Sequence, residues 1–435
     1  MSRIAFIGAG SMVFAKKLVG DLLSFPELAD SEIVLMDIDD HRLEQTERVA
    51  RAMVENGDVG ATIEATTDRR EALEGADYVL NMINVGGTEP FENEIRIPER
   101  YGVEQAIGDT LGPGGIFRGL RTIPTMLEIA RDMEELCPDA LLLNYTNPMA
   151  ICCWALFEAT EIETVGLCHS VQHTAEAIAD YLELPQAELE YWVAGINHVA
   201  WFLELEHEGQ DLYPDLRAAM DDGTIYEQDT VRFDLMKHFG RFVTESSHHN
   251  SEYHPYFRTD PAEIERLEGT GYAERMPTAT YLEGWKERSA ERDDALADVD
   301  LDAVGIERSE EYASRLIHSL ETGTPRRLNL NVANETGAIA NLPTAACVEV
   351  PCLVDGTGVH PCSVGDLPQP LVGITRTNVN VQELAVRGAL EGDREAVHQA
   401  VKLDPLTAAS LTLEEIHEMT EELLVANEAY LPTLE

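Results

Sequence analysis

Short apolar runs alternate with longer stretches of mixed polarity along the first 170 residues of the chain. The apolar runs are typical of buried strands, and the mixed stretches, in which apolar residues recur every three or four positions, are typical of amphipathic helices. This alternation predicts a parallel sheet with helices on both faces. We expect strands at residues 4–7, 33–38, 78–83, 140–144 and 165–168, and helices that include 15–23 and 122–136.

The pattern changes beyond about residue 190. A long apolar run at 196–205 predicts one further strand, followed by acidic loops, a loop rich in His and Ser at 246–254, and a helix at 307–320. A stretch rich in Pro and Gly at 353–371 precedes C-terminal helices. Because 435 residues exceed what one hydrophobic core usually holds, we predict two closely packed domains, a doubly wound α/β domain at 1–190 and an α+β domain at 191–435.

The charge of the chain is strongly unbalanced, with 80 acidic against 31 basic residues and a formal net charge of −49. The acids are spread along the chain rather than gathered in a tail. This predicts a carboxylate-covered surface adapted to concentrated salt, where repulsion is screened within about 3 Å at 1 M. An acidic face for a cationic partner is the alternative interpretation. Either surface would repel nucleic acid, so we expect no nucleic-acid partner.

Neither membrane spans nor disulfides are expected from the sequence. No apolar run approaches the roughly 20 residues that a membrane span needs. The chain begins directly with an apolar strand and has no basic region followed by a cleavage site, so we expect a cytoplasmic protein. Its seven cysteines are odd in number and form no CxxC pair, which argues against a disulfide framework or a zinc knuckle.

A glycine-rich turn follows the first predicted strand. Gly8 permits a tight turn, Gly10 lets the backbone approach a pyrophosphate, and Ser11 opens the helix whose N-terminus would hold that group. The third glycine position of the usual dinucleotide fingerprint is Val13, so the match is partial. Asp37, at the end of the second strand, could accept hydrogen bonds from a ribose 2′-OH and would repel a 2′-phosphate. The turn therefore predicts a Rossmann-type domain that binds NAD rather than NADP.

Two further segments offer polar groups to a ligand rich in hydroxyls. Residues 108–118 contain four glycines in eight positions together with Asp109 and Arg118, which are candidate hydroxyl contacts. A flexible surface loop with a capping Asp is an equally good interpretation of this segment. Asn147 follows a predicted strand at the carboxyl edge of the sheet, where open α/β sheets bind ligands, and its amide both donates and accepts. Asn147 also fits a turn that starts a helix at Pro148.

A thiol and an imidazole indicate a possible metal site. Cys168 ends a predicted strand beside His169, and His198 lies about 30 residues further on. A thiolate and an imidazole that converge from different elements can hold a divalent metal and leave positions open for substrate oxygens. A buried free Cys and a hydrogen-bonded core His fit the spacing as well. A thiolate ligand would by itself suggest zinc or iron before manganese.

Residues 245–253 are dense in groups that exchange protons. His248 and His249 are adjacent and lack other spaced ligands, which is more typical of a polar loop than of a metal site. Tyr253 could act as a base if a neighbouring cation lowered its pKa.

These segments together resemble family 4 of the glycoside hydrolases, and in particular its melibiase-like, α-galactosidase branch. The resemblance runs through nearly the whole chain in ordered blocks. Beyond the nucleotide turn, these are residues 108–124, 144–150, 166–172, 194–198, 245–257, 341–343 and 352–355. It implies dependence on NAD and a divalent metal, commonly Mn²⁺, and a fold similar to lactate and malate dehydrogenases.

The resemblance also implies roles for single residues. Cys168 and His198 match the metal ligands, Asn147 matches a substrate-binding Asn, and Tyr253 matches the catalytic base. His169 matches the position of the proton donor. Family members that act on 6-phosphosugars carry Asp or Asn after the metal-binding Cys, whereas the sequence from Cys168 to Val171 is similar to that of enzymes for unphosphorylated α-glycosides.

The mechanism implied by the resemblance is oxidation followed by elimination. NAD⁺ takes a hydride from C3 of the sugar, Tyr253 removes the C2 proton, the C1 substituent departs with help from His169, and water then adds to C1 before the hydride returns. An α-glucosidase or α-galacturonidase with the same mechanism is the main alternative. A 2-hydroxy-acid dehydrogenase and a non-enzymatic NAD-binding regulator are others. The family resemblance further suggests a homodimer or homotetramer.

Overall fold

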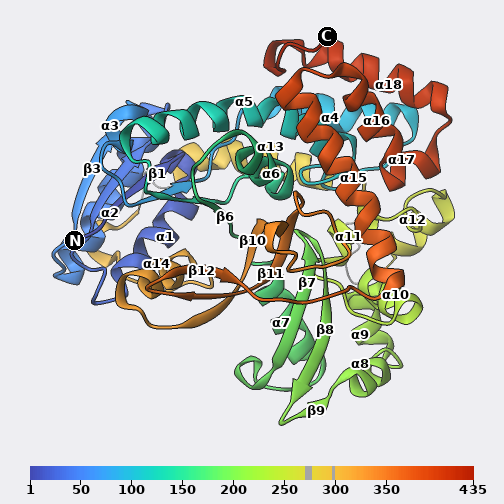
Figure 1. The fold of residues 1–435 in the computed structure, drawn as a ribbon, viewed down its shortest axis with the longest axis horizontal. Helices are drawn as coiled ribbons and strands as arrows, with labels where there is room; N and C mark the ends of the chain where they lie inside the picture. The colour runs from blue at the N-terminus through green and yellow to red at the C-terminus, as the bar shows by residue number, and fades with distance from the viewer. Residues whose placement is uncertain (270–276, 296–298) are drawn as a thin grey trace.

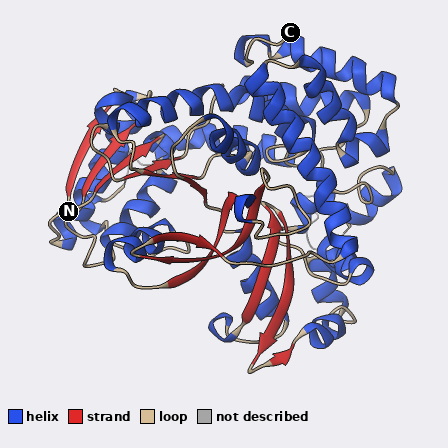
Figure 2. Ribbon diagram, in the orientation of Figure 1, coloured by secondary structure: helices blue, strands red, loops and turns tan. Residues whose placement is uncertain are grey.

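The described residues of the computed structural model, 1–269, 277–295 and 299–435, are built around one 12-stranded sheet (Figures 1 and 2). Its first six strands are parallel and lie in the order 3-2-1-4-5-6, the strand order of a Rossmann domain. The predicted fold class is therefore confirmed. In sheet order these strands are β3 (Thr62–Thr66), β2 (Glu32–Met36), β1 (Arg3–Ile7), β4 (Tyr78–Asn81), β5 (Leu141–Asn144) and β6 (Thr164–Gly166).

The sheet continues beyond β6 with antiparallel strands. Asn331 of β10 pairs with Gly166 of β6, so strands from both sides of residue 190 share one sheet. The division into two domains at 190 stays a prediction. The antiparallel strands are β10 (Arg326–Ala333), β11 (Cys347–Asp355), β7 (Glu190–Ile196), β8 (Val199–His207) and β9 (Gln210–Asp211), and β12 (Gly358–Pro361) pairs with β11.

The helices of the parallel half follow the strands in βα alternation. Asp39 and Asp68 cap α2 and α3 by accepting hydrogen bonds from backbone N–H groups of the first turn. The helix α6 is buried along its whole first half, because it lies between α5, α15 and the strands β10 and β11. These helices are α1 (Val13–Leu23), α2 (Asp40–Gly57), α3 (Arg69–Leu73), α4 (Thr88–Tyr101), α5 (Gly112–Leu136), α6 (Met149–Ala159) and α7 (Ser170–Tyr181).

Most of the later helices pack on the antiparallel strands or on earlier helices. The last ones, α16 to α18, gather at one corner of the molecule (Figure 1), where α18 packs on α4 and α16 packs on α5. The helices are α8 (Tyr213–Ala219), α9 (Gly223–Gln228), α10 (Thr230–Phe239), α11 (Ser247–Tyr253), α12 (Pro261–Glu268), α13 (Thr280–Ala295), α14 (Ala313–Thr322), α15 (Gln369–Glu391), α16 (Arg394–Leu403), α17 (Pro405–Ser410) and α18 (Leu413–Ala426). Short 3₁₀ turns lie at Ala9–Ser11, Gln186–Glu188, Leu301–Ala303, Asn334–Thr336 and Glu428–Tyr430.

The smallest of the three buried apolar clusters in the described residues joins α4 to the start of α13, and two more extensive clusters hold the other elements together. The larger cluster runs through the parallel strands and on to the C-terminal helices, so it spans both sides of residue 190. The smaller one packs the outer ends of β7 and β8 against α7, α8 and α10. Within the described ranges, no helix is both long and apolar enough to cross a membrane.

The strand expected at 196–205 is present as β8, but it begins at Val199, because residues 196–198 end the unpredicted strand β7 and form a turn. Ile196 and Val199 pair with each other across a tight hairpin, and His198 has a φ of 66°. Both strands of the hairpin are buried at this end, so the apolar pattern continues through the turn without a break. Asn and His are among the few residues other than Gly that adopt this left-handed conformation readily.

Three helix predictions also need correction. Helix α5 begins at Gly112 and not near 122, and its glycines serve close packing, since a Cβ on Gly114 would lie 2.4 Å from the Gly108 carbonyl oxygen. Helix α14 begins only at Ala313, because Ser309 is held by Asp21 in a non-helical segment. The loop expected at 246–254 contains α11, which Ser246 caps through His249 N–H.

Candidate active site

The nucleotide turn lies between the ends of β1 and β2. Gly8 has a φ of 95°, and a Cβ there would come within 2.9 Å of the Met82 backbone. The N–H of Gly10 donates to Asp37 Oδ2 at 2.7 Å, and a Cβ on Gly10 would meet the same carboxylate. Gly8 is therefore required by the backbone geometry, whereas a side chain at Gly10 would displace the carboxylate of Asp37, which lies directly beside the turn.

Three exposed side chains surround this turn. Ser11 is exposed at the start of the helical segment, and Val13, at the third fingerprint position, is 51% exposed. Ile38 was expected to end the second strand, but β2 stops at Met36 and Ile38 is 90% exposed. The turn thus combines an acidic group with apolar side chains that no other part of the described chain covers.

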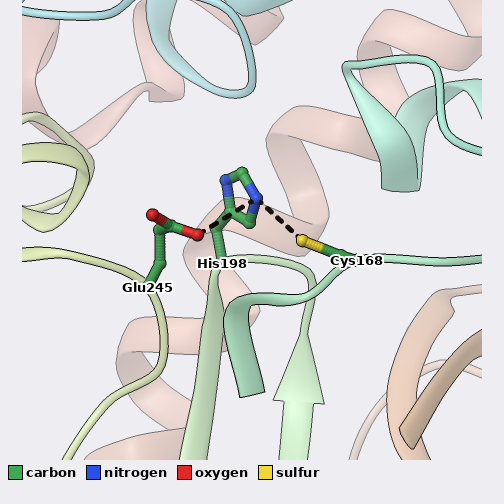
Figure 3. A group of neighbouring side chains, drawn as sticks. All are labelled: Cys168, His198 and Glu245. Atoms are coloured by element: carbon green, nitrogen blue, oxygen red, sulfur yellow. Dashed lines mark hydrogen bonds and ion pairs between the residues drawn. The ribbon is translucent and has the colours of Figure 1, made fainter. Parts of the chain in front are cut away.

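Cys168 and His198 meet with a third residue, Glu245 (Figure 3). Cys168 follows β6, His198 lies in the β7–β8 turn, and Glu245 precedes α11 with a φ of 66°. His198 Nε2 lies 3.3 Å from the Cys168 Sγ and 3.6 Å from Glu245 Oε2. All three potential ligand atoms lie within 4.8 Å of one another. We call this group the Cys168 site.

The sequence reasoning missed Glu245 as a member of the Cys168 site. Its position in a polar loop carried no ligand spacing relative to Cys168 or His198 that could have identified it. The donor set of one sulfur, one nitrogen and one oxygen suits a divalent cation. The electrostatics of the site agree with a bound cation. Burial raises the pKa of the Cys168 thiol and so disfavours its thiolate, and a cation at this position would compensate by stabilising the thiolate form. Burial opposes ionisation of Glu245 too, but His249 and His198 hold the pKa of its carboxyl well below the usual range.

Tyr253 contacts the Cys168 site from its other side. The hydroxyl of Tyr253 lies 3.3 Å from His198 Nδ1, and the Thr110 hydroxyl lies 3.2 Å from the same nitrogen. Tyr253 is completely buried. Burial raises the pKa of its phenol well above 10, and the carboxylates of Glu252 and Asp109 raise it further.

His169 lies against Glu311 and His173. Its Nδ1 lies 3.1 Å from Glu311 Oε1, and its ring stacks on His173 with centroids 4.4 Å apart. Burial alone would lower the pKa of His169, but the hydrogen bond to Glu311 and the negative charges of Cys168 and Glu311 raise it to about 9. The sequence reasoning did not identify Glu311, which lies 142 positions away in the segment before α14.

The three residues expected to contact substrate hydroxyls lie together. Asn147 Nδ2 donates to Asp109 Oδ2 at 3.4 Å, and Arg118 Nε donates to the Asn147 carbonyl oxygen at 3.3 Å. Burial opposes ionisation of Asp109, but Arg118, His249 and His198 lower the pKa of its carboxyl below the usual value. Asp109 is therefore an ionised acceptor beside the Cys168 site.

Glu252 fixes the segment that carries Asp109. Its two carboxylate oxygens accept hydrogen bonds from the backbone N–H groups of Ala106, Ile107 and Gly108, at 2.7, 2.9 and 2.9 Å. The segment is thus an ordered one and not the flexible surface loop that was the alternative. Glu252 comes from α11, immediately before Tyr253, so the base candidate and the hydroxyl contacts are positioned by the same short helix.

A cavity of about 450 Å³ opens beside Glu245. Its lining includes Ser170, His173, Arg232, His249 and Tyr281. The helix that follows the nucleotide turn reaches the segment after β5, because Phe14 of α1 packs edge-on against Tyr145, with ring centroids 4.9 Å apart. The structure therefore brings nearly every residue singled out from the sequence to the carboxyl edge of one sheet.

Comparison with known proteins places this arrangement in a family. Residues 3–184 match the sequence profile of family 4 glycosyl hydrolases, and residues 193–407 match that of their C-terminal domain. The chain belongs to glycosyl hydrolase family 4. Two relatives span nearly its whole length. An α-galactosidase of Bacillus subtilis (strain 168) is 43% identical, covering 99% of both chains, and an α-galactosidase of Rhizobium meliloti (strain 1021) is 42% identical, covering 99% of this chain and 89% of that one.

Solved structures agree with this family assignment. A putative glucosidase from Bacillus subtilis has a TM-score of 0.85 at 26% identity, covering 98% of this chain and 100% of that one. The 6-phospho-β-glucosidase from Thermotoga maritima, solved with manganese, NAD⁺ and glucose-6-phosphate, has a TM-score of 0.80 at 21% identity, covering 99% and 100%. Malate dehydrogenase from Plasmodium falciparum, solved with NADH, has a TM-score of 0.53 at 14% identity, covering 90% and 99%. The expected likeness to malate dehydrogenase is thus confirmed at the level of the fold.

Proposed function

We propose that this family 4 glycosidase hydrolyses α-galactosides, with NAD and a divalent cation, Mn²⁺, as its cofactors. The observation that carries the proposal is the Cys168 site, which lies in hydrogen-bonding contact with Tyr253 through one imidazole ring. The α-galactoside specificity rests on the two relatives of that name, which are 43% and 42% identical to this chain. The sequence from Cys168 to Val171 supports an unphosphorylated substrate.

Gly8, Gly10, Ser11 and Asp37 would bind the NAD. The two glycines leave room for a pyrophosphate at the backbone, and the carboxylate of Asp37 would accept hydrogen bonds from the adenosine ribose and repel a 2′-phosphate. The exposed side chains of Val13 and Ile38 offer apolar surface for a flat base. A fold neighbour crystallised with NAD⁺ and manganese fits this assignment.

Cys168 and His198 would hold the metal, with Glu245 as a third ligand. When bound, NAD supplies a hydride acceptor for C3 of the sugar and the cation polarises the resulting carbonyl. The chain's own contribution begins with His198. Its Nε2 faces Cys168 and Glu245, so its ring proton belongs on Nδ1, where it can be donated to the oxygen of Tyr253.

Tyr253 would remove the proton from C2. Burial disfavours its phenolate, but a hydrogen bond from His198 Nδ1–H stabilises that form, and a cation at the Cys168 site adds the neighbouring positive charge that lowers a phenol pKa. A proton acceptor positioned in this way contributes about 10²–10⁴-fold to a rate.

His169 would donate a proton to the leaving group. Burial lowers the pKa of its imidazole, but the hydrogen bond to Glu311 raises it and so favours the protonated form that a proton donor needs. Glu311 binds Nδ1, so the proton given to the leaving group would be the one on Nε2. Asn147, Asp109 and Arg118 would bind the sugar hydroxyls, with Asp109 as an acceptor and the two others as donors.

The test is a panel of nitrophenyl α-galactoside, α-glucoside and α-galacturonide, assayed with and without NAD⁺ and Mn²⁺. We expect the highest kcat/KM with the galactoside, no turnover in protein stripped of both cofactors, and deuterium at C2 of galactose released in D₂O. Full activity without cofactors, or product free of deuterium, would refute the mechanism. Faster turnover of another glycoside would refute only the sugar assignment, and net NADH accumulation with a 2-hydroxy acid would point to a dehydrogenase.

Three wider expectations belong to this proposal. A net charge of −49 predicts that the fold needs concentrated salt, and circular dichroism in dilute buffer tests it. A homodimer or homotetramer is expected from the family resemblance, and a cytoplasmic location from the N-terminal sequence. Each of these stays a prediction.

A further inference from the structure

A second cluster of metal-binding side chains lies far along the chain from the Cys168 site. It consists of His398 on α16 and of His417 and Glu421 on α18, two neighbouring helices at the corner of the molecule seen in Figure 1. Each residue offers one ligand atom, and these atoms lie within 4.8 Å of one another. None of the three belongs to the active site described above.

The geometry is close to that of a bound ion. His398 Nε2 lies 2.8 Å from Glu421 Oε1, and the rings of His398 and His417 stack with centroids 4.6 Å apart. Tetrahedral zinc with bonds of about 2.0–2.2 Å separates its ligand atoms by about 3.4 Å. His417 is exposed and lies one helical turn before Glu421 on the same face of α18, and its ligand atom lies within 4.8 Å of those of His398 and Glu421.

The surroundings orient the carboxylate for a single bond to an ion. Arg394 holds the other oxygen of Glu421, Oε2, at 2.6 Å, which leaves Oε1 directed at His398. A second partner that fixes a ligand in this way is a common feature of metal sites. Burial lowers the pKa of His398, which keeps its imidazole in the neutral form that binds metals. The acidic residues of α18 add negative charge nearby, namely Glu414, Glu415, Glu418 and Glu422.

We propose that His398, His417 and Glu421 bind a divalent cation of the zinc class and thereby clamp α16 to α18. Two imidazoles, one carboxylate and one open position form a set that zinc accepts. The clamp would stabilise the C-terminal helices, which pack on α4 and α5 and so support the glycine-rich segment of the active site. Zinc that binds only the folded protein raises its melting temperature.

The experiment uses Zn²⁺ as the probe and the full-length Cys168→Ser protein as the background, so that the active site loses its thiolate. Isothermal titration calorimetry and equilibrium dialysis would compare Cys168→Ser with Cys168→Ser/His417→Ala. We expect one Zn²⁺ fewer per chain in the double variant, together with loss of a Zn²⁺-induced rise in melting temperature of at least about 2 °C. His360, an exposed His on β12 outside the cluster, is the matched control, and Cys168→Ser/His360→Ala should keep both effects.

His417 is exposed, so its replacement should leave the metal-free fold intact, and melting in EDTA checks this. Glu421→Gln in the same background is the second variant, since it keeps the size of the side chain and removes the anionic ligand. An equal Zn²⁺ stoichiometry in all variants would overturn the proposal. So would a stoichiometry that responds to His360→Ala as strongly as to His417→Ala.

Discussion

The nucleotide turn and the Cys168 site lie at the same edge of one sheet, but they are built in different ways. The turn is a local structure, in which Gly10 and Asp37 are joined by one hydrogen bond across two adjacent parallel strands. The Cys168 site takes its residues from three separate segments, after β6, between β7 and β8, and before α11. The turn therefore depends on backbone conformation and on contacts between neighbouring parallel strands, whereas the Cys168 site depends on contacts between segments that are far apart along the chain. A substitution at one of the two sites should therefore leave ligand binding at the other site unchanged.

The largest effect is expected from Cys168→Ser. Loss of the thiolate should lower kcat/KM by more than about 10³-fold and weaken Mn²⁺ binding, since even outer partners of metal ligands are worth about 10–100-fold. NAD affinity, measured by fluorescence titration, should stay unchanged. Cys362→Ser is the matched control, because Cys362 is a free and partly exposed cysteine outside the site. Unchanged activity in Cys168→Ser would remove Cys168 from the metal site.

Tyr253→Phe should lower kcat by about 10²–10⁴-fold through loss of the base. The Thr110 hydroxyl also lies 3.2 Å from His198 Nδ1 and can keep this ring oriented, so the fold should remain and the Mn²⁺ affinity should fall far less than kcat. Incorporation of deuterium from D₂O at C2 distinguishes a base from a residue that only binds substrate. In Tyr253→Phe this incorporation should fall as kcat falls. Tyr256→Phe, at a 51% exposed position three residues away, should behave like the wild type. A mild loss in Tyr253→Phe would assign the proton to another acceptor.

Asp404 supports the glycine-rich segment from the C-terminal side, and its effect should depend on pH. It caps α17 by accepting from Thr407 N–H at 2.9 Å, and burial raises the pKa of its carboxyl to about 6. A folded-state pKa above the unfolded value of 3.8 means that stability falls as pH rises from about 4 to 6. Asp404→Asn cannot ionise, so the stability of the wild type relative to this variant should drop by about 2 kcal/mol between pH 4 and 7. Urea unfolding at constant salt measures this difference, and a difference that rises with pH would contradict it.

Glu311→Gln should act through His169 and therefore depend on the leaving group. Without the carboxylate, the imidazole of His169 loses the negative charge that favours its protonated form and the hydrogen bond that orients it. Hydrolysis of unactivated galactosides should therefore slow by about 10–100-fold. Nitrophenyl galactoside, whose leaving group needs no proton, should be affected much less. Glu310→Gln, at the neighbouring position that pairs with Lys17, is the control. Equal losses for both kinds of substrate would assign Glu311 a structural role only.

The same contrast explains how much could be predicted from the sequence. The glycines of the turn and five of the six parallel strands follow from local patterns, and these strands were predicted to within one or two residues at each end. The edge strand β3 was not predicted, because only one of its five residues is buried. Glu245 and Glu311 carried no local signal, because their partners lie 47 and 142 positions away. The hairpin at His198 was missed because buried strands on both sides made the apolar pattern continuous. Predictions from sequence failed where long-range contacts decide the conformation.

The smallest effect is expected at the turn itself, from Asp37→Ala. Loss of the acceptor for the ribose hydroxyls should weaken NAD binding by about 10-fold, equivalent to about 1.4 kcal/mol, and should reduce the preference for NAD over NADP. The Mn²⁺ affinity should not change, because no hydrogen bond or ion pair in the described structure joins Asp37 to the Cys168 site. Asp40→Asn, exposed in the first turn of α2, is the control. A parallel loss of Mn²⁺ affinity in Asp37→Ala would mean that the turn and the Cys168 site are one coupled unit, and the contrast between a local and an assembled site would then be wrong.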